Sequence, residues 1–138
     1  MSRYVSKELA AEVQKRAKGR CEYCLIAAED TYFGMEIDHI RSRKHNGLTE
    51  SENLALACQP CNRNKGSDLG SISETTNELT KFFNPRTNNW VDHFQINESG
   101  EIVALTSVGE VTSAIFRFND RERIIERIGL IELGRYPE

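Results

Sequence analysis

Four residues in one short stretch of the chain carry side chains that suit phosphodiester hydrolysis. Asp38 and His39 are adjacent, Asn53 follows a polar loop, and Asn62 comes directly after a cysteine. A neutral imidazole, with an ordinary pKa of about 6.5, can take a proton from water. A carboxylate and an amide oxygen are hard ligands that suit Mg²⁺, which takes further ligands from water and substrate phosphates. Asp38, His39 and Asn62 therefore fit metal-assisted hydrolysis, with His39 activating water and the ion stabilising charge on the phosphate.

All cysteines of the chain fall into two Cys-x-x-Cys pairs. The pairs are Cys21 with Cys24 and Cys58 with Cys61. A two-residue spacer lets both thiolates of a pair bind one tetrahedral ion, and two pairs complete a Cys₄ shell for Zn²⁺. Such a closed shell has no open position for a substrate, so we expect the zinc to be structural and its loss to unfold this region. The alternative is two disulfides, which a reducing compartment disfavours, or unrelated core thiols, which the complete pairing of the cysteines disfavours.

The elements that must position these residues begin with a helix. Apolar residues recur at every fourth position near the N-terminus and predict a helix over 7–18. Ser6 is its expected N-cap and Gly19 its expected stop. The zinc would fix the end of this helix against a strand at residues 54–58.

The Asp-His pair lies at the end of an expected strand. Residues 31–40 predict two short strands with Gly34 at the bend, and Asn62 is expected to open a short helix. Neighbouring residues of a regular strand point to opposite faces. Asp38 and His39 can therefore serve one site only if the strand ends or twists sharply there.

The C-terminal half has a different composition. Residues 67–83 are rich in Ser, Thr, Asn and Glu, with some helical pattern. A hairpin of residues 92–96 and 101–105 and helices over about 107–118 and 120–133 are expected beyond it. Asn119 is the expected cap of the last helix. The predicted fold class is α+β, with a zinc-bearing core over 1–70 and an extension over 71–138 that packs with it as a single domain.

Composition and charge set limits on the partners. The chain has 138 residues and a net charge of −3, but the acidic excess lies in the C-terminal half, while residues 1–24 and 38–65 are slightly basic. Affinity for phosphate depends on local potential, so nucleic acid stays a permitted partner. No apolar run approaches the roughly 18 residues of a membrane span, and the N-terminal stretch lacks the apolar core of a signal peptide. We therefore expect a cytoplasmic protein that does not bind a membrane.

These residues together resemble the HNH endonuclease family, whose fold is the ββα-metal or His-Me finger. The resemblance covers about residues 15–70 and depends on the order of Asp38-His39, Asn53 and Asn62 within the two cysteine pairs. The segments NLALACQPCNRNKGS and FFNPRTNNWVDHF are similar to a bacterial branch of that family. Asn62 stands where the family often has His, which makes this an HNN variant; an amide oxygen still binds a hard cation.

The resemblance implies a role for each motif residue. His39 would be the general base, Asp38 and Asn62 would hold a catalytic Mg²⁺ or another divalent cation, and Asn53 would brace the loop that orients His39. The implied activity is hydrolysis of nucleic acid, most of all DNA. Oligomeric state, a homodimer included, is left open.

Each of these functional assignments has a simpler structural alternative. A lone histidine is more often structural, and His93 is expected to pack near Trp90, while His45 is as well explained by a solvated loop as by a phosphate contact. Basic residues that could line a phosphate backbone, or form an ordinary charged surface, are Arg41, Arg43, Lys44, Arg63 and Lys65, with Lys65 the first choice. Two rival functions are a zinc-knuckle module that binds nucleic acid without cutting it and a protein-interaction domain that uses the acidic C-terminal half.

Overall fold

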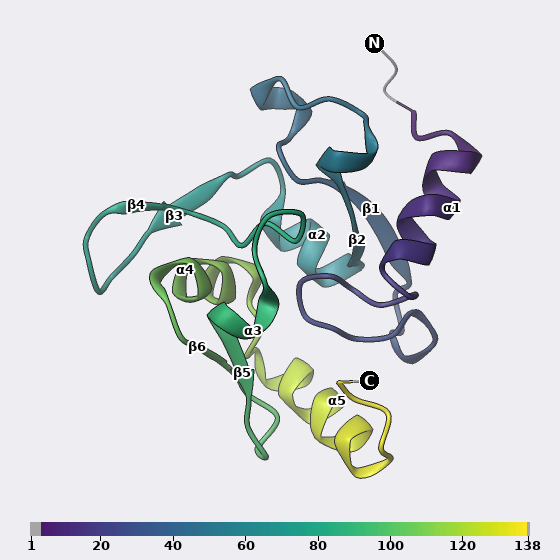
Figure 1. Ribbon diagram of the computed structural model, residues 1–138. Coiled ribbons are helices and arrows are strands. Elements are labelled where there is room, and N and C mark those ends of the chain that lie inside the picture. The colour runs from purple at the N-terminus through teal and green to yellow at the C-terminus, as the bar shows by residue number, and fades with distance from the viewer. Residues whose placement is uncertain (1–3, 138) are drawn as a thin grey trace. The chain divides into compact units, whose positions relative to one another are not determined.

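The computed structural model describes residues 4–137 and shows an α+β protein. Within that range, the strands form separate two-stranded antiparallel sheets (Figure 1). The chain divides into two compact units, Met1–Leu69 and Gly70–Glu138, close to the predicted boundary. That the two halves pack as a single domain stays a prediction. None of the helices described is long and apolar enough to cross a bilayer.

The first unit begins with the predicted N-terminal helix. Helix α1 spans Lys7–Arg16, and the Ser6 hydroxyl accepts a hydrogen bond from the Leu9 N–H at 3.1 Å, as expected of an N-cap. The helix ends two residues earlier than predicted, because Lys18 and Gly19 both take left-handed φ angles. The buried Val13 of this helix packs in a core with Leu54 and Leu56.

A β-hairpin is the centre of the first unit. Strand β1 (Met35–His39) pairs antiparallel with β2 (Leu54–Cys58), so that Met35 lies opposite Cys58 and His39 opposite Leu54. All residues of β2 are buried, as its apolar run predicted. The second strand expected within residues 31–40 is wrong. Tyr32 and Phe33 are exposed and do not belong to a strand, and β1 begins directly after a turn at Gly34.

Helix α2 follows the hairpin without a loop. It spans Gln59–Lys65 with Cys58 as its N-cap and Pro in its first turn. The prediction that Asn62 opens this helix is therefore wrong, because proline, with its fixed φ, starts the helix earlier. Helices α1 and α2 lie on the two sides of the β1–β2 hairpin (Figure 1). Short 3₁₀ turns complete the unit: η1 (Ala28–Asp30), η2 (Arg43–His45) and η3 (Ser51–Asn53).

The second unit contains two hairpins. Strands β3 (Gly70–Ile72) and β4 (Leu79–Lys81) form the first, where the sequence suggested helical character. Strands β5 (Phe94–Ile96) and β6 (Ile102–Ala104) form the predicted second hairpin. The two residues before Phe94 are not in a strand, because they close the short helix α3 (Trp90–His93).

Two helices end the second unit, as predicted. Helix α4 spans Ser107–Phe116 and contacts β3, β4 and β6, and α5 spans Arg121–Glu132. The expected cap by Asn119 is wrong, because its side chain instead bonds the backbone of Ile102. The core of this unit is aromatic, with edge-to-face pairs among its buried rings: Phe82, Phe83, Phe94, Phe116 and Phe118.

Candidate active site and cysteine cluster

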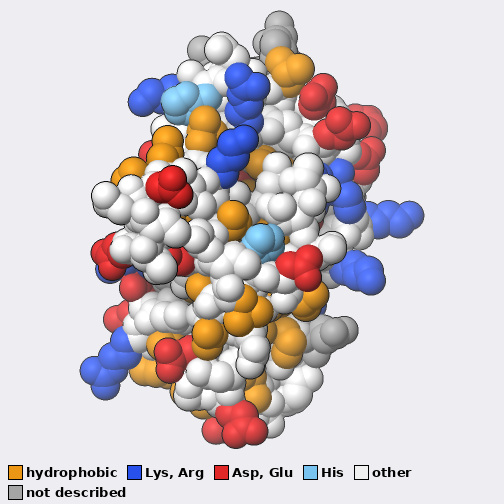
Figure 2. Space-filling model, turned by 60° about the vertical axis from the view of Figure 1, so that its left-hand side comes forward, with side chains coloured by type: hydrophobic (Ala, Val, Ile, Leu, Met, Phe, Trp, Pro, Cys, Tyr) orange, Lys and Arg blue, Asp and Glu red, His pale blue; other side chains and the backbone are white. Residues whose placement is uncertain are grey.

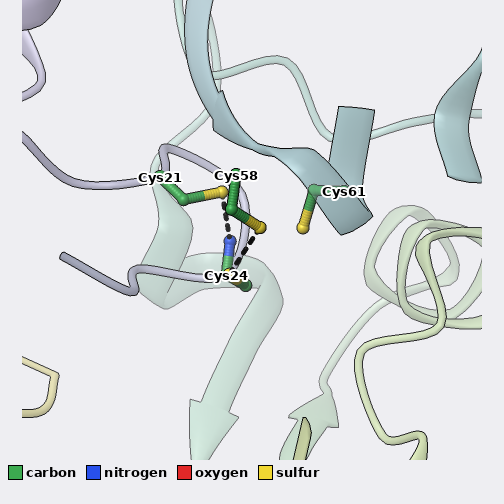
Figure 3. Close-up of side chains that lie close together, drawn as sticks. All are labelled: Cys21, Cys24, Cys58 and Cys61. Carbon is green, nitrogen blue, oxygen red and sulfur yellow. Dashed lines mark hydrogen bonds between the residues drawn. The ribbon is translucent and has the colours of Figure 1, made fainter. Parts of the chain in front are cut away.

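The four cysteines converge on one point, as their spacing predicted. Their sulfur atoms all lie within 4.8 Å of one another, and all four side chains are buried (Figure 3). One pair comes from the loop after α1, and the other flanks the junction of β2 with α2. The sulfurs of Cys24 and Cys58 are 3.6 Å apart, which is too long for a disulfide bond of about 2.05 Å.

This cluster fits a zinc ion. Sulfurs bound at about 2.3 Å to a tetrahedral Zn²⁺ lie roughly 3.8 Å from one another. The sulfurs of Cys24 and Cys58 are close to that distance, at 3.6 Å. The Cys24 N–H donates to the sulfur of Cys21 at 3.3 Å, a contact that stabilises thiolate charge. Burial raises the pKa of Cys61, and hydrogen bonding with Cys21 raises that of Cys58. A bound dication would offset the cost of holding these thiolates buried.

His39 is the last residue of β1, and its ring is held from the loop that follows. The imidazole Nε2 lies 2.9 Å from the Thr49 hydroxyl. Burial lowers the pKa of His39, and the nearby Arg43 and Lys65 lower it further, while Asp38 opposes that fall. The ring is therefore neutral at pH 7, the state that a general base requires.

Asp38 points the other way, into the interior. Its side chain is 3% exposed, and both carboxylate oxygens accept hydrogen bonds. The Tyr23 hydroxyl donates to Oδ2 at 2.6 Å and the Lys65 ammonium donates to Oδ1 at 3.1 Å. Burial raises the pKa of Asp38, and the charge of Lys65 opposes the rise. Burial also raises the pKa of Tyr23, so its phenol stays protonated and remains a donor.

Both residues predicted to hold a catalytic dication already have partners of their own. A cation at Asp38 would lie beside the buried ammonium of Lys65. Asn62 lies one turn inside α2, and its amide nitrogen donates to the Glu36 carboxylate at 2.8 Å. Glu36 in turn forms an ion pair with Arg63 at 2.9 Å. The hydrogen bond from Arg63 lowers the pKa of Glu36.

Asn53 ties the polar loop to the end of β1. Its side-chain oxygen accepts from the Arg41 N–H at 2.8 Å, and its amide nitrogen donates to the carbonyls of Arg41 and Leu48 at 2.9 and 2.8 Å. Gly47 lies against this loop, and a Cβ there would overlap the Arg41 carbonyl. That Asn53 acts through this loop to orient His39 stays a prediction.

The basic residues of the site are of two kinds. Arg41, Arg43 and Lys44 are exposed on the loop after β1, where a phosphate can reach them. Lys65 is different, because it is 2% exposed and its ammonium bonds Asp38 and the His39 carbonyl. Its predicted phosphate contact would require it to leave this interior position. Acidic and basic side chains are interspersed on the face drawn in Figure 2, so no broad surface of one sign is seen there.

Comparison with known proteins adds one match. Residues 21–68 match the family model described as HNH endonuclease. The matched segment contains both cysteine pairs, the β1–β2 hairpin and α2, so this part of the chain is similar to an HNH endonuclease domain. No curated protein was found to match the chain.

Three residues of the site were missed at the level of sequence. Thr49 holds the ring of His39, Tyr23 bonds Asp38, and Glu36 bonds Asn62. Strand alternation offered a signal for Glu36, because it lies two residues before Asp38 on the same face of β1. Tyr23 lies inside the first cysteine pair and is buried beside the cysteine cluster. No pattern marked Thr49 among the other polar loop residues.

Proposed function

We propose that the HNH domain hydrolyses phosphodiester bonds in nucleic acid, with DNA as the first substrate to test, and that His39 is the general base. The observation that carries the proposal is the position of the His39 imidazole, fixed by Thr49 at the end of β1 inside the matched segment, and burial lowers the pKa of this ring. When Nε2–H donates to the Thr49 hydroxyl, Nδ1 keeps the lone pair that accepts a proton from water. Asn53 supports this geometry by holding the loop that carries Thr49.

The substrate would be bound by the exposed basic residues of the loop. Arg41, Arg43 and Lys44 follow His39 closely in sequence, and cationic side chains at such positions bind the phosphate backbone without reading its sequence. Arg63 on α2 is exposed and could contribute, although Glu36 already neutralises part of its charge. The HNH family commonly uses a divalent cation, and Mg²⁺ is the first to test.

The test is cleavage of supercoiled plasmid by the wild type and by His39→Ala, each with Mg²⁺, with Mn²⁺ and with EDTA. We expect nicked or linear product from the wild type and a loss of about 10²–10⁴-fold in rate from His39→Ala. Equal cutting by both proteins would remove His39 from the mechanism. Zinc content and circular dichroism of both proteins control for folding.

One observation favours a second candidate, a module that binds nucleic acid without cutting. Both oxygens of Asp38 already accept hydrogen bonds, one of them from a buried ammonium that would repel a cation at this carboxylate. This module would bind DNA or RNA in a salt-dependent manner, cut neither with any of the metals, and lose no affinity in His39→Ala.

A further inference from the structure

We propose that Lys65 is a positioning residue: its buried ammonium stands in place of a divalent ion at Asp38 and fixes the end of β1 that carries His39. The role of His39 as the base rests on the proposed function, but the placement of Lys65 can be tested without substrate.

The geometry ties three elements of the first unit together. Lys65 is the last residue of α2, and its Nζ donates to Asp38 Oδ1 at 3.1 Å and to the His39 carbonyl at 2.9 Å. Tyr23, from the loop of the first cysteine pair, donates to the other oxygen of Asp38 at 2.6 Å. Lys65, Asp38 and Tyr23 are 2%, 3% and 0% exposed.

A buried ammonium is costly unless charge and hydrogen bonds compensate it. Here a carboxylate and a carbonyl accept from it, and the carboxylate has its second oxygen bonded as well. A divalent cation on Asp38 would do the same electrostatic work, and at this buried carboxylate it would be repelled by the ammonium of Lys65. The position is therefore already filled by a charge that the chain itself supplies.

The second bond of Lys65 explains how it acts on His39. The peptide group is planar, so the bond from Lys65 to the His39 carbonyl fixes the orientation of the whole peptide group between His39 and Ile40. Thr49 holds the ring at Nε2. His39 is thus fixed at its backbone by α2 and at its ring by the loop, although Asp38 and His39 point to different faces of the strand.

Lys65→Met tests the proposal, because methionine keeps an unbranched side chain and removes the charge. Lys15→Met, at an exposed position on α1, is the control. Tyr23→Phe is the second variant, since it keeps the buried ring and loses only the bond to Asp38. The first measurement is the ¹⁵N signals of the imidazole, assigned with His39→Gln. We expect the signals of His39 to shift in Lys65→Met, to shift less in Tyr23→Phe, and to stay in Lys15→Met.

The second measurement is cleavage with the same proteins, at equal zinc content. We expect Lys65→Met to lower kcat by at least about tenfold, short of the ~10²–10⁴-fold expected for loss of a general base, with KM within twofold of wild type. Unchanged His39 signals with wild-type kcat would overturn the proposal. A change in KM and in salt dependence alone would instead show a phosphate contact.

Binding of Mn²⁺, followed by its electron paramagnetic resonance, tests whether the ammonium of Lys65 occupies the place of a cation at Asp38. We expect Lys65→Met to bind Mn²⁺ more tightly than the wild type, because the charge that occupies Asp38 is gone, and we expect this gain to disappear when Asp38→Asn is added. Equal Mn²⁺ affinity in the wild type and in Lys65→Met would show that the ammonium does not stand in place of a divalent ion and would overturn the proposal. A wild type that cuts nothing would defeat the proposed function, while the imidazole signals would still decide whether Lys65 positions His39.

Discussion

The side-chain amide of Asn53 bonds both the N–H and the carbonyl of Arg41, as a backbone partner in a neighbouring strand would. The same amide nitrogen reaches the Leu48 carbonyl, on the far side of the loop. The side chain of Asn53, at the end of the loop between β1 and β2, is therefore bonded to Arg41 at the start of that loop. Thr49 comes directly after Leu48, so this closure also places the hydroxyl that meets His39.

Asn53→Asp should open this loop while keeping the shape of the side chain. Aspartate cannot donate, so the carbonyls of Arg41 and Leu48 lose their partner and face a negative charge, at about 1–3 kcal/mol for an unsatisfied group. We expect faster amide hydrogen exchange over residues 41–49 and cleavage reduced by at least about tenfold. Asn84→Asp in the second unit is the control, and equal exchange in both variants would contradict this account.

The cysteine cluster and the hairpin could be predicted from local patterns. Two Cys-x-x-Cys pairs are typical of a single metal site. The short apolar run LALAC is typical of a buried strand. The small hairpin of β3 and β4 was missed, because its strands have three residues each and a polar composition. Pairing across residues 70–81 depends on packing against α4, which no local pattern reports.

The environment of Lys65 could not be predicted for a related reason. In the sequence it lies in the polar run NRNKGS, which is typical of a solvated helix end. Its burial depends on Tyr23 and Asp38, which are distant in sequence and meet it only after the hairpin and α2 have packed. A charged residue in a polar segment predicts surface charge, whereas the tertiary fold buries Lys65.

Thr49→Val should weaken the candidate base without changing its charge. Valine keeps the branched shape and loses the hydroxyl that meets Nε2 of His39. A hydrogen bond of this kind is worth about 0.5–1.5 kcal/mol, so we expect kcat to fall roughly three- to tenfold. Thr49→Ser retains the hydroxyl and should stay close to wild type. If serine and valine behaved alike, the hydroxyl would have no part in catalysis.

Removal of zinc should unfold the first unit. Structural Zn²⁺ contributes its binding free energy to folding, about 10–16 kcal/mol in small zinc-finger peptides. We expect one zinc per chain by elemental analysis, and rapid amide exchange over residues 4–69 after chelation. Added Zn²⁺ should restore protection and added Mg²⁺ should not. Full protection of β2 in the metal-free protein would mean that the thiols pack without an ion.

Lys44→Gln should weaken nucleic-acid binding evenly across sequences. Lys44 is exposed on η2, and each phosphate contact contributes a slope of about 0.9 to the dependence of log affinity on log salt. We expect the slope measured in a His39→Ala background, which prevents cutting, to fall by about one. Lys15→Gln removes a charge elsewhere on the same unit. An equal loss in both variants would show an effect of net charge and no specific contact.

Arg127→Met should destabilise the second unit, because this buried guanidinium serves as a hydrogen-bond donor to the backbone. It donates to the carbonyls of Gly100 and Phe118 at 2.6 and 2.5 Å and to Asn119 Oδ1 at 2.9 Å. Methionine fills part of the volume but leaves buried carbonyls unsatisfied, so we expect a loss of about 2–4 kcal/mol in unfolding free energy.

Urea unfolding followed by the fluorescence of Trp90 measures this loss. Trp90 is the single tryptophan and packs on Phe94, with ring centroids 5.0 Å apart, so its emission reports on the aromatic core of the second unit. Arg121→Met, at an exposed position at the start of the same helix, is the matched control and should stay within about 0.5 kcal/mol of wild type. Equal midpoints for the two variants would mean that water satisfies these carbonyls as well as the guanidinium does, and that the burial of Arg127 contributes no stability.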